Sequence, residues 1–295
     1  MTSCTSCSTA VLPAVSEVDV AVLRPPVSGT RHRPGTVAVV LPLAWLAIVV
    51  AGSVLIPLVG EGPDAISAEG LQSPSLAEPF GTDELGRSVL DRTATAGRTS
   101  LFISLSAVLL GTLVGVVIGA LAAIRGRIAS EALMRTMDVL LAFPAIILAL
   151  VLGLMFGKGT GAVILVIAIV LVPQVVRLVR SRLVSEFQHE YVLAEIAAGA
   201  STPRILGYHV SRNVAGALLA FTGLALADAV IFEAALSFLG LGVQPPAPSW
   251  GNMIVDGQAL LASGAWWVSV FPGLALCLTV LALNTLVDRS FERWA

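Results

Sequence analysis

Long apolar runs separated by short polar segments set the pattern of this chain. A membrane-spanning helix needs about 20 predominantly apolar residues. Six runs reach or approach that length, at residues 36–60, 100–124, 136–156, 161–179, 214–240 and 266–287. The pattern therefore predicts an all-α integral membrane protein with six transmembrane helices.

Composition supports this class and excludes others. The chain has 295 residues, of which 56% are hydrophobic and 12% are charged, and its mean hydropathy is +0.92. Soluble domains carry about 25% charged residues. A formal net charge of −2 gives no attraction to nucleic acid. The three cysteines form neither a disulfide framework nor a complete metal site, so we expect no bound metal.

The distribution of basic residues predicts the orientation of the spans. If the N-terminus lies in the cytosol, thirteen of the seventeen Lys and Arg residues fall in cytoplasmic segments. Because cytoplasmic loops are enriched in Lys and Arg, this favours an N-in, C-in topology. Residues 1–35 are polar and lack an apolar signal-peptide core, so we expect a disordered cytoplasmic tail followed by a transmembrane domain over residues 36–295. The outer segment (61–97) and the outer loop (241–265) then face away from the cytosol.

One long polar interruption, residues 177–213, is both basic and rich in helix formers. Helix propensity predicts a helix over residues 186–198. Gly199 follows where a helix C-terminus favours a residue with positive φ. Thr202 and Pro203 then form an N-cap and first position for a second short helix. This pattern predicts a pair of helices broken at Gly199, although an ordinary surface hairpin would share it.

This segment resembles the cytoplasmic coupling loop of ABC importer permeases, most closely the C-type subunit of dipeptide and oligopeptide importers. The positions that carry the resemblance are Tyr191, Val192, Ala194, Ala197, Gly199, Ala200, Ser201, Arg204 and His209. Leu193, Glu195 and Arg212 depart from the family pattern. Three further phrases are similar to the same family, in the same order, at residues 80–90, 134–144 and 233–251. The resemblance implies the type I ABC importer permease fold.

The resemblance also implies partners and a division of labour. The coupling loop, residues 183–213, would dock onto one of two cytoplasmic ATPase subunits, which bind ATP and Mg. A second homologous permease would complete a heterodimer in the lipid bilayer of the bacterial cell membrane. The outer loop would project toward an extracytoplasmic substrate-binding lipoprotein through Gln244, Pro245, Pro246 and Trp250. This chain itself would be no enzyme and hold no cofactor.

Two acidic residues lie inside the fifth apolar run. An ionisable group in hydrocarbon costs at least about 2.5–3.5 kcal/mol, so it normally faces a wet cavity or a partner. We expect Asp228 to line the translocation pathway. For Glu233, a pathway position and a hydrogen bond to a neighbouring helix are equal alternatives. A proton-coupled secondary carrier could use both acids as a proton relay, and that is the rival function. Within the family, permeases for nickel chelates or glutathione remain alternatives to a peptide permease.

Several smaller patterns complete the expectations. Ala107, Gly111, Gly115 and Gly119 recur at four-residue spacing, which favours close packing between helices. Pro144 should kink the third span. Residues 153–160 superficially resemble a phosphate-binding loop, but the glycine spacing is wrong and the Ser/Thr position is Gly159. We therefore expect no nucleotide binding by this chain.

Overall fold

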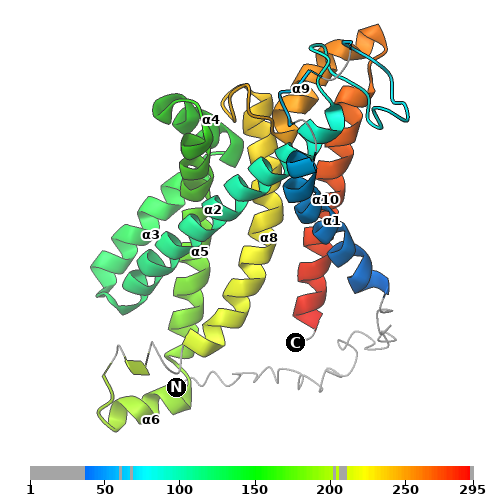
Figure 1. Cartoon of the computed structure of the whole chain (residues 1–295). Coiled ribbons are helices and arrows are strands. Elements are labelled where there is room, and N and C mark those ends of the chain that lie inside the picture. Colours follow the sequence, from blue (N-terminus) through cyan, green and yellow to red (C-terminus); the bar gives the residue numbers. More distant parts are fainter. Residues whose placement is uncertain (1–36, 60–61, 67–68, 202–203, 206–210, 293–295) are drawn as a thin grey trace, which may run out of the picture. The chain divides into compact units, whose positions relative to one another are not determined.

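The computed structural model describes residues 37–59, 62–66, 69–201, 204–205 and 211–292, which belong to one compact unit (Figure 1). The predicted tail, residues 1–35, lies outside the described residues. Those residues that are described form helices joined by turns, with two isolated β-bridges, Ile66–Arg87 and Thr82–Ser88, in the outer segment. The predicted all-α class is confirmed.

Among the described residues, five helices are long and apolar enough to cross a membrane by themselves. They are α1 (Val37–Val59), α2 (Val89–Ile124), α5 (Thr160–Glu186), α8 (Ser211–Phe238) and α10 (Trp267–Glu292). Each covers all or nearly all of one of the predicted apolar runs. The remaining run is divided between two helices, α3 (Arg127–Ala142) and α4 (Ala145–Phe156), which make a sixth span if they are counted as one.

The predicted kink at Pro144 is a complete break. Helices α3 and α4 meet at an angle of 96°. Proline disfavours the helical conformation in the residue before it. Accordingly Phe143 is extended, with φ −85° and ψ 138°, and ends α3, while Pro144 caps α4.

Two helices extend well beyond the runs that predicted them. Helix α2 begins at Val89, eleven residues before residue 100, because its first three turns mix polar and apolar residues and contain no proline. Helix α5 continues to Glu186, seven residues beyond residue 179. The helix predicted from residue 186 therefore belongs in part to α5, and the separate helix α6 covers only Glu190–Ala197.

The closest helix pair is α2 with α5, and the glycine spacing explains it. A Cβ atom added at Gly115 would lie 2.6 Å from the Val175 Cβ, and one at Gly119 would lie 2.9 Å from the Val179 Cβ. A Cβ at Gly111 would lie 2.9 Å from the Ala168 carbonyl oxygen. The predicted packing role of these glycines is confirmed, and it lets α5 lie directly against α2.

The outer loop contains a helix that hydropathy did not reveal. Helix α9 spans Trp250–Leu260 and is followed by the 3₁₀ helix η3, Leu261–Ser263. Ser249 and Asn252 form a reciprocal capping box at its start. The indole N–H of Trp250 donates to the carbonyl of Thr93 in α2 at 3.1 Å. These bonds hold α9 against the outer ends of the spans.

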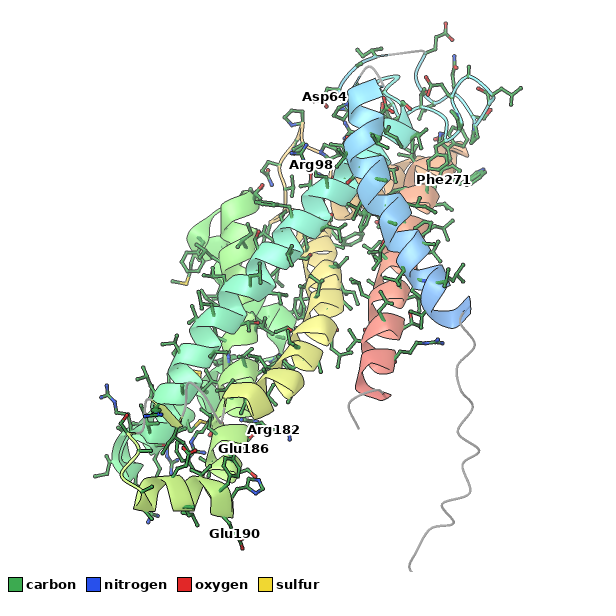
Figure 2. All side chains as sticks on the ribbon, turned by 60° about the horizontal axis from the view of Figure 1, so that its bottom comes forward. Asp64, Arg98, Arg182, Glu186, Glu190 and Phe271 are labelled. Atoms are coloured by element: carbon green, nitrogen blue, oxygen red, sulfur yellow. The ribbon has the colours of Figure 1, made fainter. Side chains whose placement is uncertain are left out.

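Opposite ends of this unit therefore carry different polar structures. Figure 2 shows Asp64, Arg98 and Phe271 at one end, and Arg182, Glu186 and Glu190 at the other. The first end holds the outer segment and α9, and the second holds the coupling loop. The outer segment and the coupling loop therefore lie at opposite ends of the unit, and the direction in which the unit crosses a membrane stays a prediction.

Candidate functional site

The coupling loop contains a short helix that ends in a glycine turn. Gly199 has φ +84°, as its position after the helix predicted. The N–H of Gly199 donates to the Ile196 carbonyl, and the N–H of Ala200 donates to the Glu195 carbonyl, both at 3.0 Å. This paired arrangement is a Schellman motif, which favours glycine at the residue with positive φ. The predicted break at Gly199 is confirmed, whereas Thr202, Pro203 and His209 lie outside the described residues.

Two apolar side chains attach this loop to the membrane helices. Val192 is 0% exposed and, with Ile205, joins the core cluster that contains Val179 and Leu183 of α5 and Val214 of α8. The loop is therefore fixed to both α5 and α8, the helices that enter and leave it.

Other residues of α6 present apolar side chains to its surroundings. Leu193 is 53% exposed and Ile196 is 50% exposed. Tyr191 is also exposed, and its hydroxyl donates to Glu186 Oε2 at 2.8 Å. The other predicted coupling residues in the described part are exposed or half-buried, namely Ala194, Ala197, Ala200, Ser201 and Arg204. Exposed apolar side chains on a helix of this kind suit a protein partner.

Polar contacts tie the cytoplasmic ends of α3 and α5 together. Arg177 Nη2 lies 2.6 Å from Asp138 Oδ1, and Arg180 Nε donates to Ser130 Oγ at 3.0 Å. The first pair is about half exposed, so it contributes little stability by itself. The contacts fix the direction in which α5 leaves the bundle.

Asp228 lies in a small hollow between α5 and α8. The hollow has a volume of about 40 Å³ and is lined by Gln174, Asp228 and apolar side chains. Both polar side chains are exposed. Asp228 makes no hydrogen bond or ion pair with another described residue. The structure therefore leaves this carboxylate open to the surroundings of the chain, as the pathway hypothesis requires.

Glu233 has the second of the two expected environments. Its side chain is 0% exposed, and the hydroxyl of Ser237 donates to Oε1 at 2.8 Å. Ser249 donates in turn to Ser237 at 3.3 Å, while Ser100 accepts from the Trp250 N–H at 3.3 Å. A serine cluster thus surrounds Glu233 where α2, α8 and the start of α9 meet. Its geometry is that of a buried contact between elements and leaves no exposed pathway surface.

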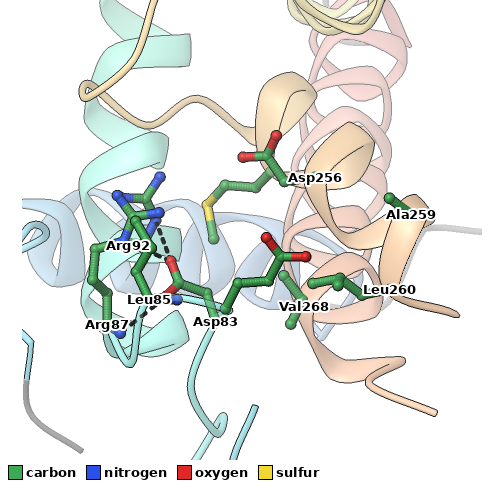
Figure 3. Close-up of a pocket in the computed structure, with 10 residues that line it drawn as sticks. Asp83, Leu85, Arg87, Arg92, Asp256, Ala259, Leu260 and Val268 are labelled. Atoms are coloured by element: carbon green, nitrogen blue, oxygen red, sulfur yellow. Dashed lines mark hydrogen bonds and ion pairs between the residues drawn. The ribbon is translucent and has the colours of Figure 1, made fainter. Parts of the chain in front are cut away.

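A charged pocket occupies the opposite, outer end of the unit. It has a volume of about 330 Å³ and lies between the outer segment and α9 (Figure 3). Asp83 Oδ2 accepts from Arg87 Nε at 2.6 Å and lies 3.6 Å from Arg92 Nε. Across the pocket, burial raises the pKa of Asp256, and the nearby guanidinium of Arg92 opposes that shift. The arginines therefore hold the outer segment against the start of α2.

The predicted outer-loop residues divide into two groups. Gln244, Pro245 and Pro246 are exposed and available to a partner. Trp250 was predicted to face the binding protein, but its side chain is 1% exposed. That assignment is wrong for the side chain, because the indole packs between α2 and α10 and anchors α9.

The sequence interpretation missed the neighbours that give the acids their environments. The sequence analysis assigned no role to Gln174, Ser100, Ser237 or Ser249. Ser237 does lie four residues after Glu233, a spacing that places both on one helix face. Ser100 and Ser249 belong to distant parts of the chain and had no comparable signal.

The fold defines a class, a helical membrane protein whose described residues include five helices long and apolar enough to span the bilayer. The chain belongs to the family of binding-protein-dependent transport system inner membrane components, which it matches over residues 115–293. It is thus the inner membrane permease component of an ABC transporter, the non-catalytic part that works with an ATPase and a binding protein.

Named relatives are similar over most of their length. The di/tripeptide transport system permease protein DppC of Pseudomonas aeruginosa is 40% identical over 71% of this chain and 69% of its own. A putative peptide permease protein of Brucella suis is 41% identical over 73% of this chain and 72% of its own. A putative peptide transport system permease of Brucella abortus is 37% identical over 88% and 86%, respectively.

The fold itself has a solved counterpart. A chain of the inward-facing MetNI methionine ABC transporter matches with a TM-score of 0.52 over 66% of this chain and 94% of that chain. Sequence identity is 17%, so the likeness concerns the fold. It supports the predicted importer permease architecture.

Proposed function

We propose that this chain forms half of the translocation pathway of a bacterial peptide importer, in an N-in, C-in orientation. The observation that carries the proposal is the coupling loop. Its buried Val192 fixes α6 to the spans, while Leu193 and Ile196 present an apolar face outward. The peptide substrate is supported by relatives that are about 40% identical and named as peptide permeases.

The proposed complex contains a second homologous permease, two ATPase subunits and a substrate-binding lipoprotein. The exposed face of α6 docks onto an ATPase, and closure of the ATPases displaces the coupling loop. Because the loop joins α5 to α8, the displacement moves both spans and changes the side from which the pathway is accessible. On the outer side, Gln244, Pro245 and Pro246 contact the binding protein.

The test is uptake into proteoliposomes that contain the complete complex. Di- and tripeptides should enter with ATP at the ATPase side and no ion gradient. A proton gradient without ATP should drive no uptake, because a proton gradient alone drives transport only in a secondary carrier. Gradient-driven uptake that Asp228→Asn abolishes would refute the proposal. ATP-driven uptake of glutathione or a nickel chelate, but not of peptides, would support the assignment as an ABC permease and refute the proposed peptide substrate.

A further inference from the structure

The hollow at Asp228 has the chemistry of a cation site. Its two polar side chains are a carboxylate and the amide of Gln174, and the remaining lining is apolar. A carboxylate accepts hydrogen bonds and carries negative charge, so its complement is a cationic donor. No described residue supplies that complement, since Asp228 has neither an ion pair nor a hydrogen bond within the described chain.

The position of Asp228 makes an unmatched charge costly. It lies ten residues before Phe238, the end of α8, and seventeen residues after Ser211, its beginning. At 1.5 Å per residue these are roughly 15 Å and 25 Å along the axis. The hydrocarbon core is about 30 Å thick, so Asp228 lies deep within it. A carboxylate at that depth faces water or a cation.

The size of the hollow restricts its occupant. A volume of about 40 Å³ exceeds the roughly 10–15 Å³ that a single water molecule needs, so a group of that size fits in the hollow. An ammonium group is of similar size to water. Pro173, beside Gln174, has no N–H for the Ile169 carbonyl, which leaves one more acceptor in this turn of α5.

We infer that Asp228 and Gln174 form a subsite for the ammonium group of the transported substrate. This inference rests on the proposed function, because a peptide brings a terminal ammonium into the pathway. The carboxylate of Asp228 accepts a charge-assisted hydrogen bond from the ammonium, and the amide oxygen of Gln174 accepts a second. Apolar neighbours such as Phe232 offer the ammonium group no other polar partner.

Covalent coupling tests the contact directly. The complete complex is loaded with alanyl-alanine through its binding protein, arrested with vanadate, and treated with a water-soluble carbodiimide. The reagent activates Asp228, the peptide amine attacks, and an amide forms as the urea leaves. Mass spectrometry should find alanyl-alanine on Asp228. Acetyl-alanyl-alanine, which has no free amine, should give no adduct, and neither should the Asp228→Asn complex.

Transport rates provide the second readout. With saturating loaded binding protein, Asp228→Asn should lower the maximal rate by roughly tenfold or more, the effect of losing a charged hydrogen bond. Asp228→Glu keeps the charge and should restore most of the rate. Leu219→Asn is the matched control, because it adds the same amide on the opposite face of α8, nine residues away, and should leave the rate unchanged.

Each contrary result has a distinct meaning. Peptide uptake at the wild-type rate in Asp228→Asn, with no adduct in the wild type, overturns the subsite and leaves the proposed function intact. A carbodiimide link from Asp228 to a lysine of another subunit, formed without substrate, assigns the hollow to a subunit interface instead. A wild-type complex that transports no peptide on ATP overturns both.

Discussion

A substitution series at Gly199 tests whether the shape of the coupling loop transmits motion. Gly199 has φ +84°, and a Cβ atom at this position would meet nothing within 4 Å. A substitution therefore causes no collision, and its cost is the conformational strain of a side chain at positive φ. The series Gly199→Asn, Gly199→Ala and Gly199→Val increases that strain while it leaves the contacts of the loop unchanged.

The magnitudes follow from the backbone angle. An L-residue in this region costs about 1–2 kcal/mol, Asn costs less, and a β-branched residue costs more. Since 1.4 kcal/mol corresponds to about tenfold in an equilibrium, Ala should reduce the population of the native turn by roughly tenfold, and Val by more. ATP-driven uptake should fall in the order Gly, Asn, Ala, Val, while the amount of assembled protein in the membrane stays constant.

A glycine with an ordinary backbone angle supplies the control. Gly126 has φ −57° and ψ 158°, and a Cβ atom there also meets nothing within 4 Å. Gly126→Val should therefore leave uptake unchanged. The assay compares uptake with ATP hydrolysis in the same proteoliposomes. Wild-type uptake by Gly199→Val, or equal losses from both valine variants, would refute the reasoning.

Three further predictions concern packing, charge and nucleotide binding. Gly115→Ala should lower the melting temperature of the purified chain, because the new Cβ would lie 2.6 Å from the Val175 Cβ and overpacking costs about 1–3 kcal/mol. The control Gly216→Ala should raise the melting temperature, because a Cβ there meets nothing within 4 Å and Ala has a higher helix propensity than Gly. Burial raises the pKa of Asp256, so ionisation of this carboxyl destabilises the fold as pH rises through the raised pKa. The variant Asp256→Asn should therefore have a higher melting temperature than the wild type at pH 7. This difference should vanish in acid, below the pKa that the Asp256 carboxyl has in the unfolded chain. Mg-ATP should not change the melting temperature of the isolated chain, and a shift that Lys158→Ala removes would contradict that prediction.

Hydropathy predicted where the spans lie but not where their helices end. The polar first turns of α2 and the last turns of α5 carry no apolar signal, because they leave the hydrocarbon while their hydrogen-bonded helices continue. Likewise, proline at residue 144 predicts a disturbance of the helix. The 96° angle between α3 and α4 depends on tertiary packing, which a local pattern does not encode.

The candidate sites follow the same division between local and distant signals. The positive φ of Gly199 was predictable because a helix ending is a local event. The burial of Trp250 was not, since its partner, the Thr93 carbonyl, is 157 residues away in sequence. Glu233 shows both cases, because Ser237 is a helical neighbour whereas Ser249 reaches it only through the fold of the outer loop.

The coupling loop and the Asp228 hollow are connected by the same two helices, α5 and α8. The loop is fixed through Val192 to a core formed with α5 and α8, and these same two helices line the hollow. On the other side of α5, the glycines of α2 leave so little space that α5 has few ways to move except together with α2. Under the proposed function, we expect a displacement of the loop to change the position of α5 relative to α8, and this change would open or close the proposed pathway at Asp228.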